Sequence, residues 1–299
     1  MKRFLVQTAN KYYKAVRTWV LQTESRFLIH AFFFLIFSPA EAIVLRQKRE
    51  TRLDAHMRTL WKQLYFSRFG TVPLYRVETD HPVAIHSDDH KWPRGTIQNN
   101  SINRRFNLKL YAMMGFRPEL TLLDLGCAGG GFVRTLIEDG HTAIGVEGSD
   151  VSKKLRSREW DTCPHHLFTA DITKPFQAAT ADGAPLAFDV VTAWEVLEHI
   201  PDEILDGLID NIRRHLRPGG YFFGSACLLP DENPLTGAVY HVTLKPREWW
   251  LERFARFNLH PVENHNFEIE DYVRGNAIGL TEWDPRTGGG FHLVLRHQP

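Results

Sequence analysis

From residue 120 onward, short apolar runs alternate with longer segments in which apolar residues recur every three or four positions. Runs rich in Val, Ile, Leu and Phe are typical of buried strands, and the three-to-four spacing is typical of amphipathic helices. Strands are predicted at Thr121–Leu125, Thr142–Glu147, His166–Thr169, Phe188–Trp194, Tyr221–Ala226, Leu259–Asn264 and Phe291–Arg296. Helices are predicted at Phe132–Asp139, Asp150–Glu159, Asp202–Leu216 and Arg247–Phe257.

This alternation of strands and helices predicts an α/β fold with a parallel, doubly wound sheet and helices on both of its faces. In such a sheet, ligands bind at the carboxyl ends of the strands, near the point where the strand order reverses. Candidate chemistry is therefore sought in the residues that follow each predicted strand.

The chain ahead of this pattern divides into two parts. Residues 1–70 are predicted to form a helical extension, because apolar residues such as Phe4, Val16 and Trp19 fall at helical spacing among basic residues. In residues 71–101 the periodicity disappears and turn-forming residues mark a loop-rich linker, which at this length is either functional or flexible. The main domain is predicted to span residues 102–299 and to begin with a helix at Ile102–Met114.

Composition changes this picture little. Of the 299 residues, 43% are hydrophobic and 24% are charged, as in ordinary globular proteins, and a net charge of +1 gives no strong nucleic-acid signal. The charge is uneven, because twelve Lys and Arg but only four Asp and Glu lie before residue 63. This basic segment could contact anionic lipid or phosphate, and the alternative is a solvated face. Three cysteines without paired spacing form neither a zinc motif nor a disulfide framework, which suits the reducing cytoplasm.

The apolar run Phe27–Phe37 is too short to span a bilayer, which needs about 20 apolar residues. Two interpretations stay open: a helix buried against the main domain, and a peripheral membrane contact through residues 1–45. The predicted location is cytoplasmic, with membrane association as the alternative.

Candidate chemistry begins at the end of the first predicted strand. The strand Thr121–Leu125 runs into the small residues Gly126-Cys127-Ala128-Gly129-Gly130-Gly131, after which a helix is predicted. Small residues let the backbone pass close beneath a ligand, with its amides and the helix N-terminus directed at that ligand. The turn predicts a nucleotide-like ligand.

Two acidic residues near the next strand ends extend this site. Glu147 lies 21 residues after Gly126, at the spacing where a carboxylate can accept both hydroxyls of a ribose. Asp171 can accept a hydrogen bond from an adenine amino group, with Ile172 against the ring, and the alternative for Asp171 is the cap of a turn.

An adenosine site of this kind fits either a dinucleotide enzyme or a methyltransferase. Asp124 favours the second, because it lies inside the strand where a dinucleotide-binding strand usually carries an apolar residue. The turn also reads Gly-x-Ala-x-Gly, at Gly126, Ala128 and Gly130, rather than Gly-x-Gly-x-x-Gly.

Taken in order, the motifs of the main domain resemble those of the class I S-adenosylmethionine-dependent methyltransferases. The resemblance implies a Rossmann-like, doubly wound, seven-stranded sheet that is mostly parallel, with Phe291–Arg296 as its antiparallel last strand. It implies S-adenosylmethionine as the methyl donor, although Ala128 departs from the commoner glycine. The similarity is carried by Leu123–Phe132, Glu147, Ala170–Ile172, Trp194–His199 and Leu216–Gly220. The donor-binding residues that it implies are Asp124, Gly126, Ala128 and Gly130 for the methionine part, Glu147 for the ribose, Asp171 and Ile172 for the adenine, and Trp194 beside the sulfonium.

A further candidate lies on the helix that precedes the glycine turn. Its arginines, Arg105 in particular, can meet the carboxylate of the donor. The alternative is an ordinary amphipathic helix.

The residues after the strand Phe188–Trp194 carry candidate acceptor chemistry. Glu195, Glu198 and His199 are spaced to share one face of a helical turn, and His241 follows 42 residues after His199. Two carboxylates and two imidazoles can bind a divalent cation such as Mg²⁺. The set resembles the metal site of small-RNA 3′-terminal ribose 2′-O-methyltransferases, and its Glu-x-x-Glu-His part resembles ubiquinone-pathway O-methyltransferases. The alternative without metal has His199 and Glu195 as the catalytic residues, or His199 as a hydrogen-bonding group.

The sequence therefore predicts a methyltransferase that acts on a hydroxyl of a small molecule or glycan. Alternatives are a membrane-associated lipid or quinone precursor, and an RNA terminal ribose, the latter weakened by the lack of basic and aromatic runs around the site. A binding or assembly module that retains the fold is the alternative without catalysis.

Overall fold

The computed structural model describes residues 55–273 and 288–298. The chain divides into two compact units, Met1–Leu64 and Tyr65–Pro299. Residues 55–69 are helical, as predicted. The helices predicted before residue 55, the basic segment and the apolar run Phe27–Phe37 lie outside the described residues. In the described part of the chain, no helix is long and apolar enough to cross a membrane.

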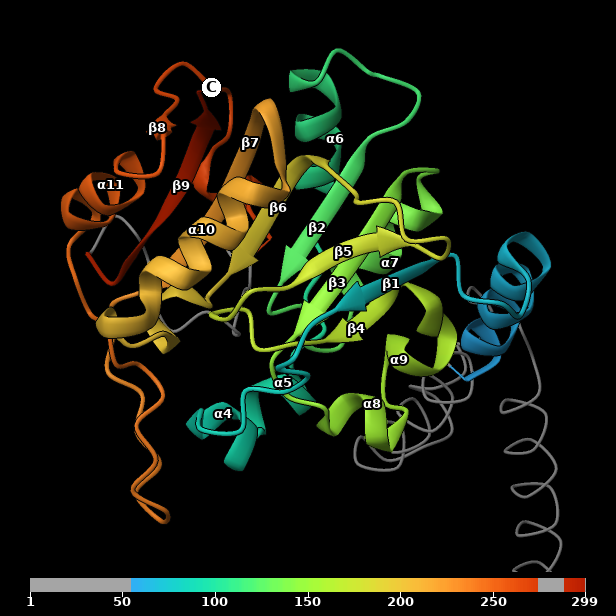
Figure 1. Cartoon of the computed structure of the whole chain (residues 1–299), viewed down its shortest axis with the longest axis horizontal. Helices are drawn as coiled ribbons and strands as arrows, with labels where there is room; N and C mark the ends of the chain where they lie inside the picture. The colour runs from blue at the N-terminus through green and yellow to red at the C-terminus, as the bar shows by residue number, and fades with distance from the viewer. Residues whose placement is uncertain (1–54, 274–287, 299) are drawn as a thin grey trace, which may run out of the picture. The chain divides into compact units, whose positions relative to one another are not determined.

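Seven strands of the second unit form one sheet, in the order β4-β3-β2-β6-β7-β9-β8 (Figure 1). Neighbours from β4 to β7 pair in parallel, and β9 is antiparallel to both β7 and β8, so the predicted doubly wound sheet with an antiparallel last strand is confirmed. The strands are β2 Thr121–Leu125, β3 Thr142–Glu147, β4 Leu167–Thr169, β6 Phe188–Trp194, β7 Leu216–Cys227, β8 Leu259–Pro261 and β9 Gly290–His297.

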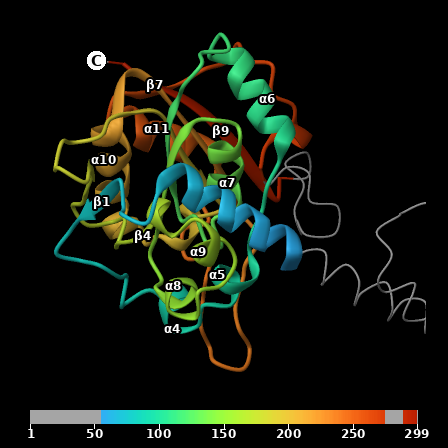
Figure 2. The ribbon, with the colours of Figure 1, turned by 90° about the vertical axis from the view of Figure 1, so that its right-hand side faces the viewer.

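Helices cover both faces of this sheet, as the two views show (Figures 1 and 2). On one face Phe254 packs on Phe222 of β7 with ring centroids 5.2 Å apart, and on the other face Phe106 packs on Phe223 at 5.3 Å. Because successive strand residues point to opposite faces, these two contacts place α11 and α6 on opposite sides. The main helices are α6 Arg104–Met113, α7 Gly131–Glu138, α10 Leu205–His215 and α11 Arg247–Ala255.

The strand order reverses between β2 and β6. The chain proceeds outward from β2 through β3 to β4 on one side, and from β6 to β7 on the other. All seven residues of β6 are buried, as expected for a central strand that is covered on both faces. The carboxyl ends of β2 and β6 therefore meet at the switch point where such sheets bind ligands.

The segment predicted as a loop-rich linker contains regular structure. A strand, β1 Tyr75–Glu78, pairs antiparallel with another strand that the periodicity missed, β5 Gln177–Thr180. Two short helices follow, α4 Asp88–Lys91 and α5 Arg94–Gln98. These elements are four or five residues long and, unlike the equally short strand Thr121–Leu125, they contain no apolar run that would mark them in the sequence.

The single helix predicted at Asp150–Glu159 is wrong. The chain forms α8 Val151–Leu155 and α9 Glu159–Thr162, separated by Arg156 and Arg158 with left-handed φ angles of 49° and 52°. This reversal brings the backbone N–H of Glu159 within 3.0 Å of the carbonyl of Gly129, so a bond to the glycine turn replaces continued helix.

Helix α10 fixes the loop after β4. The buried Asn211 side chain donates two hydrogen bonds of 2.8 Å to the carbonyls of Ile172 and Lys174. One turn earlier, Gly207 lies so close to the loop that a Cβ atom there would overlap the carbonyl oxygen of Thr173. A small residue at position 207 is thus a packing requirement.

Replacing Gly207 by Ala tests this contact. Alanine normally stabilises a helix interior by about 1 kcal/mol relative to glycine. Here the overlap with Thr173 must displace the loop, so we expect Gly207→Ala to lower the free energy of unfolding by about 1–3 kcal/mol in urea titrations. Gly95→Ala is the matched control, because Gly95 in α5 has open space around the added methyl. Equal effects of the two substitutions would contradict the packing argument.

Candidate active site

The glycine turn lies between β2 and α7. Gly126, Ala128 and Gly130 have φ angles of 71°, 45° and 85°, in the left-handed region that favours glycine. The N–H of Ala128 donates to Oε2 of Glu147 at 2.8 Å, and the carbonyl of Ala128 accepts from the Trp160 indole at 2.8 Å. These two bonds hold alanine in a conformation that costs an L residue roughly 1–2 kcal/mol.

A cavity opens directly beside this turn, with about 280 Å³ of empty space including the part open to solvent. Of the predicted donor-binding residues, Asp124, Gly126, Ala128 and Trp194 line it together. The sequence analysis did not assign its other lining residues: Asn99, Ser101, Cys127, Phe132 and Val273. Asn99 and Ser101 belong to the segment taken as a linker, where a polar run just before a helix was the available signal.

Asp124 is a buried acid that faces this cavity. Its side chain accepts a 2.7 Å hydrogen bond from the Thr192 hydroxyl of the neighbouring strand β6. Burial raises the pKa of Asp124 to about 7, and the nearby Glu147 charge acts in the same direction. A carboxyl with this pKa changes its charge near neutral pH, and a cationic ligand group beside it would favour the ionised form.

Glu147, at the end of β3, is built into the turn. Besides the bond from Ala128, its Oε1 accepts from the backbone N–H of Ser149 at 3.1 Å. Burial raises the pKa of Glu147, while the two backbone donors act against that shift. Its carboxylate lies beside the turn that borders the cavity, and its predicted contact with a ribose stays a prediction.

Asp171 caps the turn after β4. Its Oδ1 accepts from the N–H of Thr173 at 3.0 Å and from the Thr173 hydroxyl at 2.6 Å, and its own N–H donates to the carbonyl of His81 at 2.8 Å. These bonds match the turn-cap alternative. The predicted adenine contacts of Asp171 and the buried Ile172 stay predictions.

Arg105 does not line the cavity among the described residues. Its guanidinium pairs with the fully buried carboxylate of Asp271 at 2.9 Å, and Lys109 pairs with the same carboxylate at 2.7 Å. The two bases hold Asp271, two residues before the cavity residue Val273, against α6. The prediction that Arg105 meets the donor carboxylate is not tested by this ion pair.

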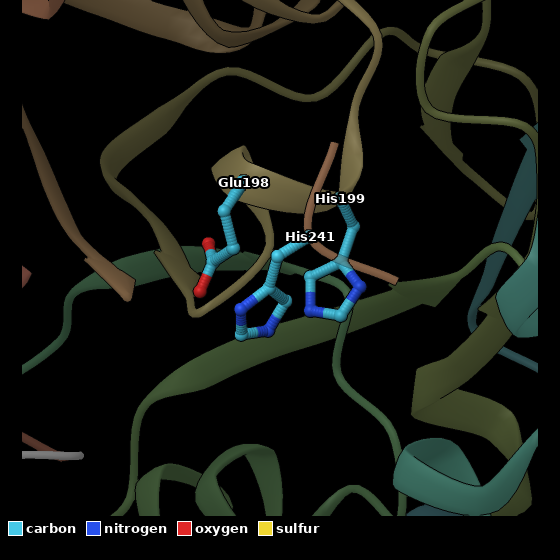
Figure 3. Close-up of side chains that lie close together, drawn as sticks. All are labelled: Glu198, His199 and His241. Atoms are coloured by element: carbon cyan, nitrogen blue, oxygen red, sulfur yellow. The ribbon is translucent and has the colours of Figure 1, made fainter. Parts of the chain in front are cut away.

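A second cluster follows β6, next along the chain from Trp194. Glu198, His199 and His241 point toward one another (Figure 3), and one ligand atom from each lies within 4.8 Å of the other two. The Oε1 atom of Glu198 accepts from the N–H of Cys227 at 2.8 Å, whereas its buried Oε2 has no hydrogen-bond partner among the described residues. Leaving a buried carboxylate oxygen without a hydrogen-bond partner costs free energy. Such an atom is therefore a candidate to bind a cation or to accept a hydrogen bond from a ligand.

The loop that carries His241 is fixed to this cluster through the backbone. The carbonyl of Glu198 accepts from the N–H groups of Val242 and Thr243 at 2.8 and 3.0 Å. The His241 ring meets the His199 ring edge to face at 4.8 Å, and its Nδ1 lies 2.5 Å from the carbonyl oxygen of Leu229. Residues 42 positions apart in the sequence are thus joined, as the metal prediction required.

The prediction that Glu195 shares a helical face with Glu198 and His199 is wrong. Glu195 has a left-handed φ of 53°, and the 3₁₀ turn begins only at Leu197. The N–H of Glu195 still bonds to Ser225 of β7, so the strand pairing extends one residue beyond β6 and takes Glu195 out of the helical turn. Glu195 is not part of the cluster of Glu198, His199 and His241.

The electrostatics of the cluster favour bound protons. Burial raises the pKa of the Glu198 carboxyl. Burial alone would lower the pKa of His199, but the carboxylates of Asp89, Glu198 and Glu195 outweigh it and raise the pKa. As an imidazolium, His199 can neither accept a proton nor bind a cation, so either role begins with the loss of one proton.

Comparison with known proteins adds the family. A family model described as a methyltransferase domain matches residues 100–268. The ubiquinone biosynthesis O-methyltransferase of Methylococcus capsulatus is 33% identical over 222 residues, which cover 70% of this chain and 86% of that protein. The protein of the same name from Nitrosomonas europaea is 30% identical over 180 residues, which cover 56% of this chain and 70% of that protein.

Among solved structures, a 1,6-didemethyltoxoflavin-N1-methyltransferase from Burkholderia thailandensis, bound to its substrate and S-adenosylhomocysteine, is 16% identical with a TM-score of 0.48. It covers 71% of this chain and 84% of that chain. The residues that the family model matches include the glycine turn, Gly126–Gly130, and the residues Glu198, His199 and His241. The chain therefore belongs to the methyltransferase-domain family, as a class I S-adenosylmethionine-dependent methyltransferase.

Proposed function

We propose that this enzyme methylates a hydroxyl group of a small molecule. The observation that carries the proposal is the cluster of Glu198, His199 and His241. It begins four residues after Trp194, and Trp194 lines the cavity beside the glycine turn. A hydroxyl is a poor nucleophile until its proton is removed, and this cluster consists of proton-accepting and cation-binding groups. An acceptor that needed no proton removal would have no use for them.

In this reaction the oxygen of the acceptor forms a bond to the methyl carbon as the bond from that carbon to the sulfonium sulfur breaks. The donor leaves as S-adenosylhomocysteine, and the hydroxyl proton passes to a base, for which we propose His199. The cavity side chains Asp124 and Trp194 hold the methionine end of the donor, so that alignment of donor and acceptor supplies much of the rate. The contacts of Gly130, Glu147, Asp171, Ile172 and Arg105 with the donor are further parts of this proposal.

As the alternative role of His199, we propose that Glu198, His199 and His241 hold a divalent cation such as Mg²⁺; His199 would then not be available as the base, and the hydroxyl proton would pass to solvent. The buried Oε2 of Glu198 suits such an ion, and the two imidazole nitrogens favour a first-row transition ion over Mg²⁺. When bound, it would lower the pKa of a hydroxyl on which it acts as a Lewis acid. Glu195, predicted as a fourth ligand, lies outside this group of three.

The names of the relatives favour a hydroxyl of a quinone precursor as the first acceptor to test. A membrane-associated precursor would suit a peripheral contact through residues 1–45, which lie outside the described residues. A glycan hydroxyl and an RNA terminal ribose are the other acceptors that the same cluster could serve.

Transfer of labelled methyl from S-adenosylmethionine to quinone precursors tests the proposal. We expect label in a methyl ether, and we expect His199→Ala to lower kcat by about 10²–10⁴-fold, the usual contribution of a general base. Affinity for S-adenosylhomocysteine should not change. His260→Ala, a histidine of β8 at the sheet edge, is the matched control. Label on nitrogen or carbon, or full activity of His199→Ala, would overturn the proposal.

The raised pKa of Asp124 predicts pH-dependent binding of the donor. Below pH 7 Asp124 is mostly protonated and loses its attraction for the ammonium group of the ligand, so affinity falls as the pH is lowered. We expect S-adenosylhomocysteine to bind up to about tenfold more weakly at pH 6 than at pH 8 in calorimetry. 5′-Methylthioadenosine lacks the ammonium and should bind equally at both pH values.

The same titration with Asp124→Asn should show weaker binding of S-adenosylhomocysteine without the pH dependence. An unchanged pH profile in that variant would assign the effect to another group.

Metal dependence is tested separately. We expect Mn²⁺ to bind to the full chain and Glu198→Gln to weaken that binding by more than about tenfold, since a charged ligand is lost. Glu203→Gln, an exposed acid four residues after His199, is the control. Methyl transfer that survives exhaustive chelation would contradict the metal proposal and leave His199 as the base.

A further inference from the structure

A carboxylate from the segment before the matched domain reaches the catalytic cluster. Oδ2 of Asp89, on helix α4, lies 2.9 Å from Nδ1 of His199. The family model begins at residue 100, so Asp89 lies outside the residues that the model matches. We propose that Asp89 is a positioning residue that holds a proton on Nδ1 of His199 and directs Nε2 toward Glu198 and His241.

Hydrogen bonds at its N-cap and to the His241 loop fix helix α4 in the position that brings Asp89 to His199. Its N-cap, Ser87, accepts a hydrogen bond from the N–H of Asp89 at 3.2 Å. The loop that carries His241 binds the same helix, through the N–H of Val239 to Oδ2 of Asp88 at 3.3 Å and through the Tyr240 hydroxyl to the carbonyl of Trp92 at 3.0 Å. The carboxylate of Asp89 is therefore presented by the element that also anchors the His241 loop.

The orientation of the His199 ring agrees with this assignment. Figure 3 shows one edge of that ring directed at His241, and the Nδ1 atom is the one that meets Asp89. The approach of Asp89 is short but too bent for a regular hydrogen bond. Catalytic hydrogen bonds are often poorly aligned before substrate binds.

The chemical consequence concerns which proton His199 gives up. An imidazolium carries protons on both ring nitrogens, and a carboxylate at Nδ1 stabilises the proton there. The proton that leaves is then the one on Nε2, and the free electron pair of Nε2 faces Glu198 and His241. The tautomer with its proton on Nδ1 leaves Nε2 free to act as a base or as a cation ligand. In both kinds of site, a carboxylate hydrogen-bonded to the other ring nitrogen commonly fixes this tautomer.

The catalytic meaning of this proposal rests on the proposed function, but the position of the proton can be measured without it. Spectra of ¹⁵N-histidine-labelled protein report the Nδ1–H of His199, assigned by its loss in His199→Gln. We expect this proton to be protected from exchange in the wild type and to be lost from the spectrum in Asp89→Ala. Lys91→Ala changes an exposed residue of the same helix, leaves the bond between Asp88 and Val239 in place, and should keep the signal.

An absent Nδ1–H signal in the wild type, or an unchanged signal in Asp89→Ala, would overturn the proposal. Loss of the signal in folded Lys91→Ala as well would also overturn it, because the effect would then come from α4 as a whole. Circular dichroism of each variant establishes that it is folded.

Activity supplies a second readout. We expect Asp89→Asn to lower kcat by about 10–100-fold, as loss of an orienting partner usually does, with unchanged affinity for S-adenosylhomocysteine. Lys91→Ala, at an exposed position of the same helix, should keep its activity. If His199→Ala proves fully active while the Nδ1–H signal depends on Asp89, the proposed function fails and the positioning role stands. If Asp89→Asn proves fully active while His199→Ala is inactive, the positioning role has no catalytic effect and the proposal fails.

Discussion

The shape of the donor site depends on how the backbone of Ala128 is held. Its left-handed conformation is unfavourable for an L residue, yet its N–H is bound by the buried Glu147 carboxylate and its carbonyl by the Trp160 indole. The bond to the Glu147 carboxylate and the bond from the Trp160 indole together offset this conformational cost of about 1–2 kcal/mol. With Ala128 fixed, Gly126 and Gly130 take the conformations that open the cavity at the end of β2.

Other parts of the second unit close on the same turn. The N–H of Gly129 donates to the carbonyl of Asn99 at 3.0 Å, and a Cβ atom at Gly129 would press on Asn99 and Asn100. On its other side the Gly129 carbonyl binds the N–H of Glu159, which explains why the chain reverses between α8 and α9. The turn therefore positions the segment at Asn99 and Asn100 as well as one wall of the cavity.

The acceptor side is assembled differently, from three segments that are distant in the sequence. Glu198 and His199 follow β6, His241 comes from the loop before α11, and Asp89 comes from α4. Hydrogen bonds from the N–H groups of Val242 and Thr243 to the carbonyl of Glu198 hold this loop in place. The loop itself, between β7 and α11, contains no helix or strand. Such a construction can change its acceptor through the loop while the sheet and the donor site remain the same.

By itself the sequence determined the seven strands of the main sheet and their mostly parallel arrangement, and it predicted a ligand site at the glycine turn, because local periodicity and the turn are properties of neighbouring residues. Asp124 and Trp194 are assigned to one site by the family resemblance, and they line one cavity because Asp124 lies next to the end of β2 and Trp194 ends the neighbouring strand β6. The tertiary structure alone decided that Asp89 meets His199, and that pairing with β7 draws Glu195 out of the helical turn. Those outcomes depend on contacts between segments far apart in the chain, which no local spacing of residues encodes.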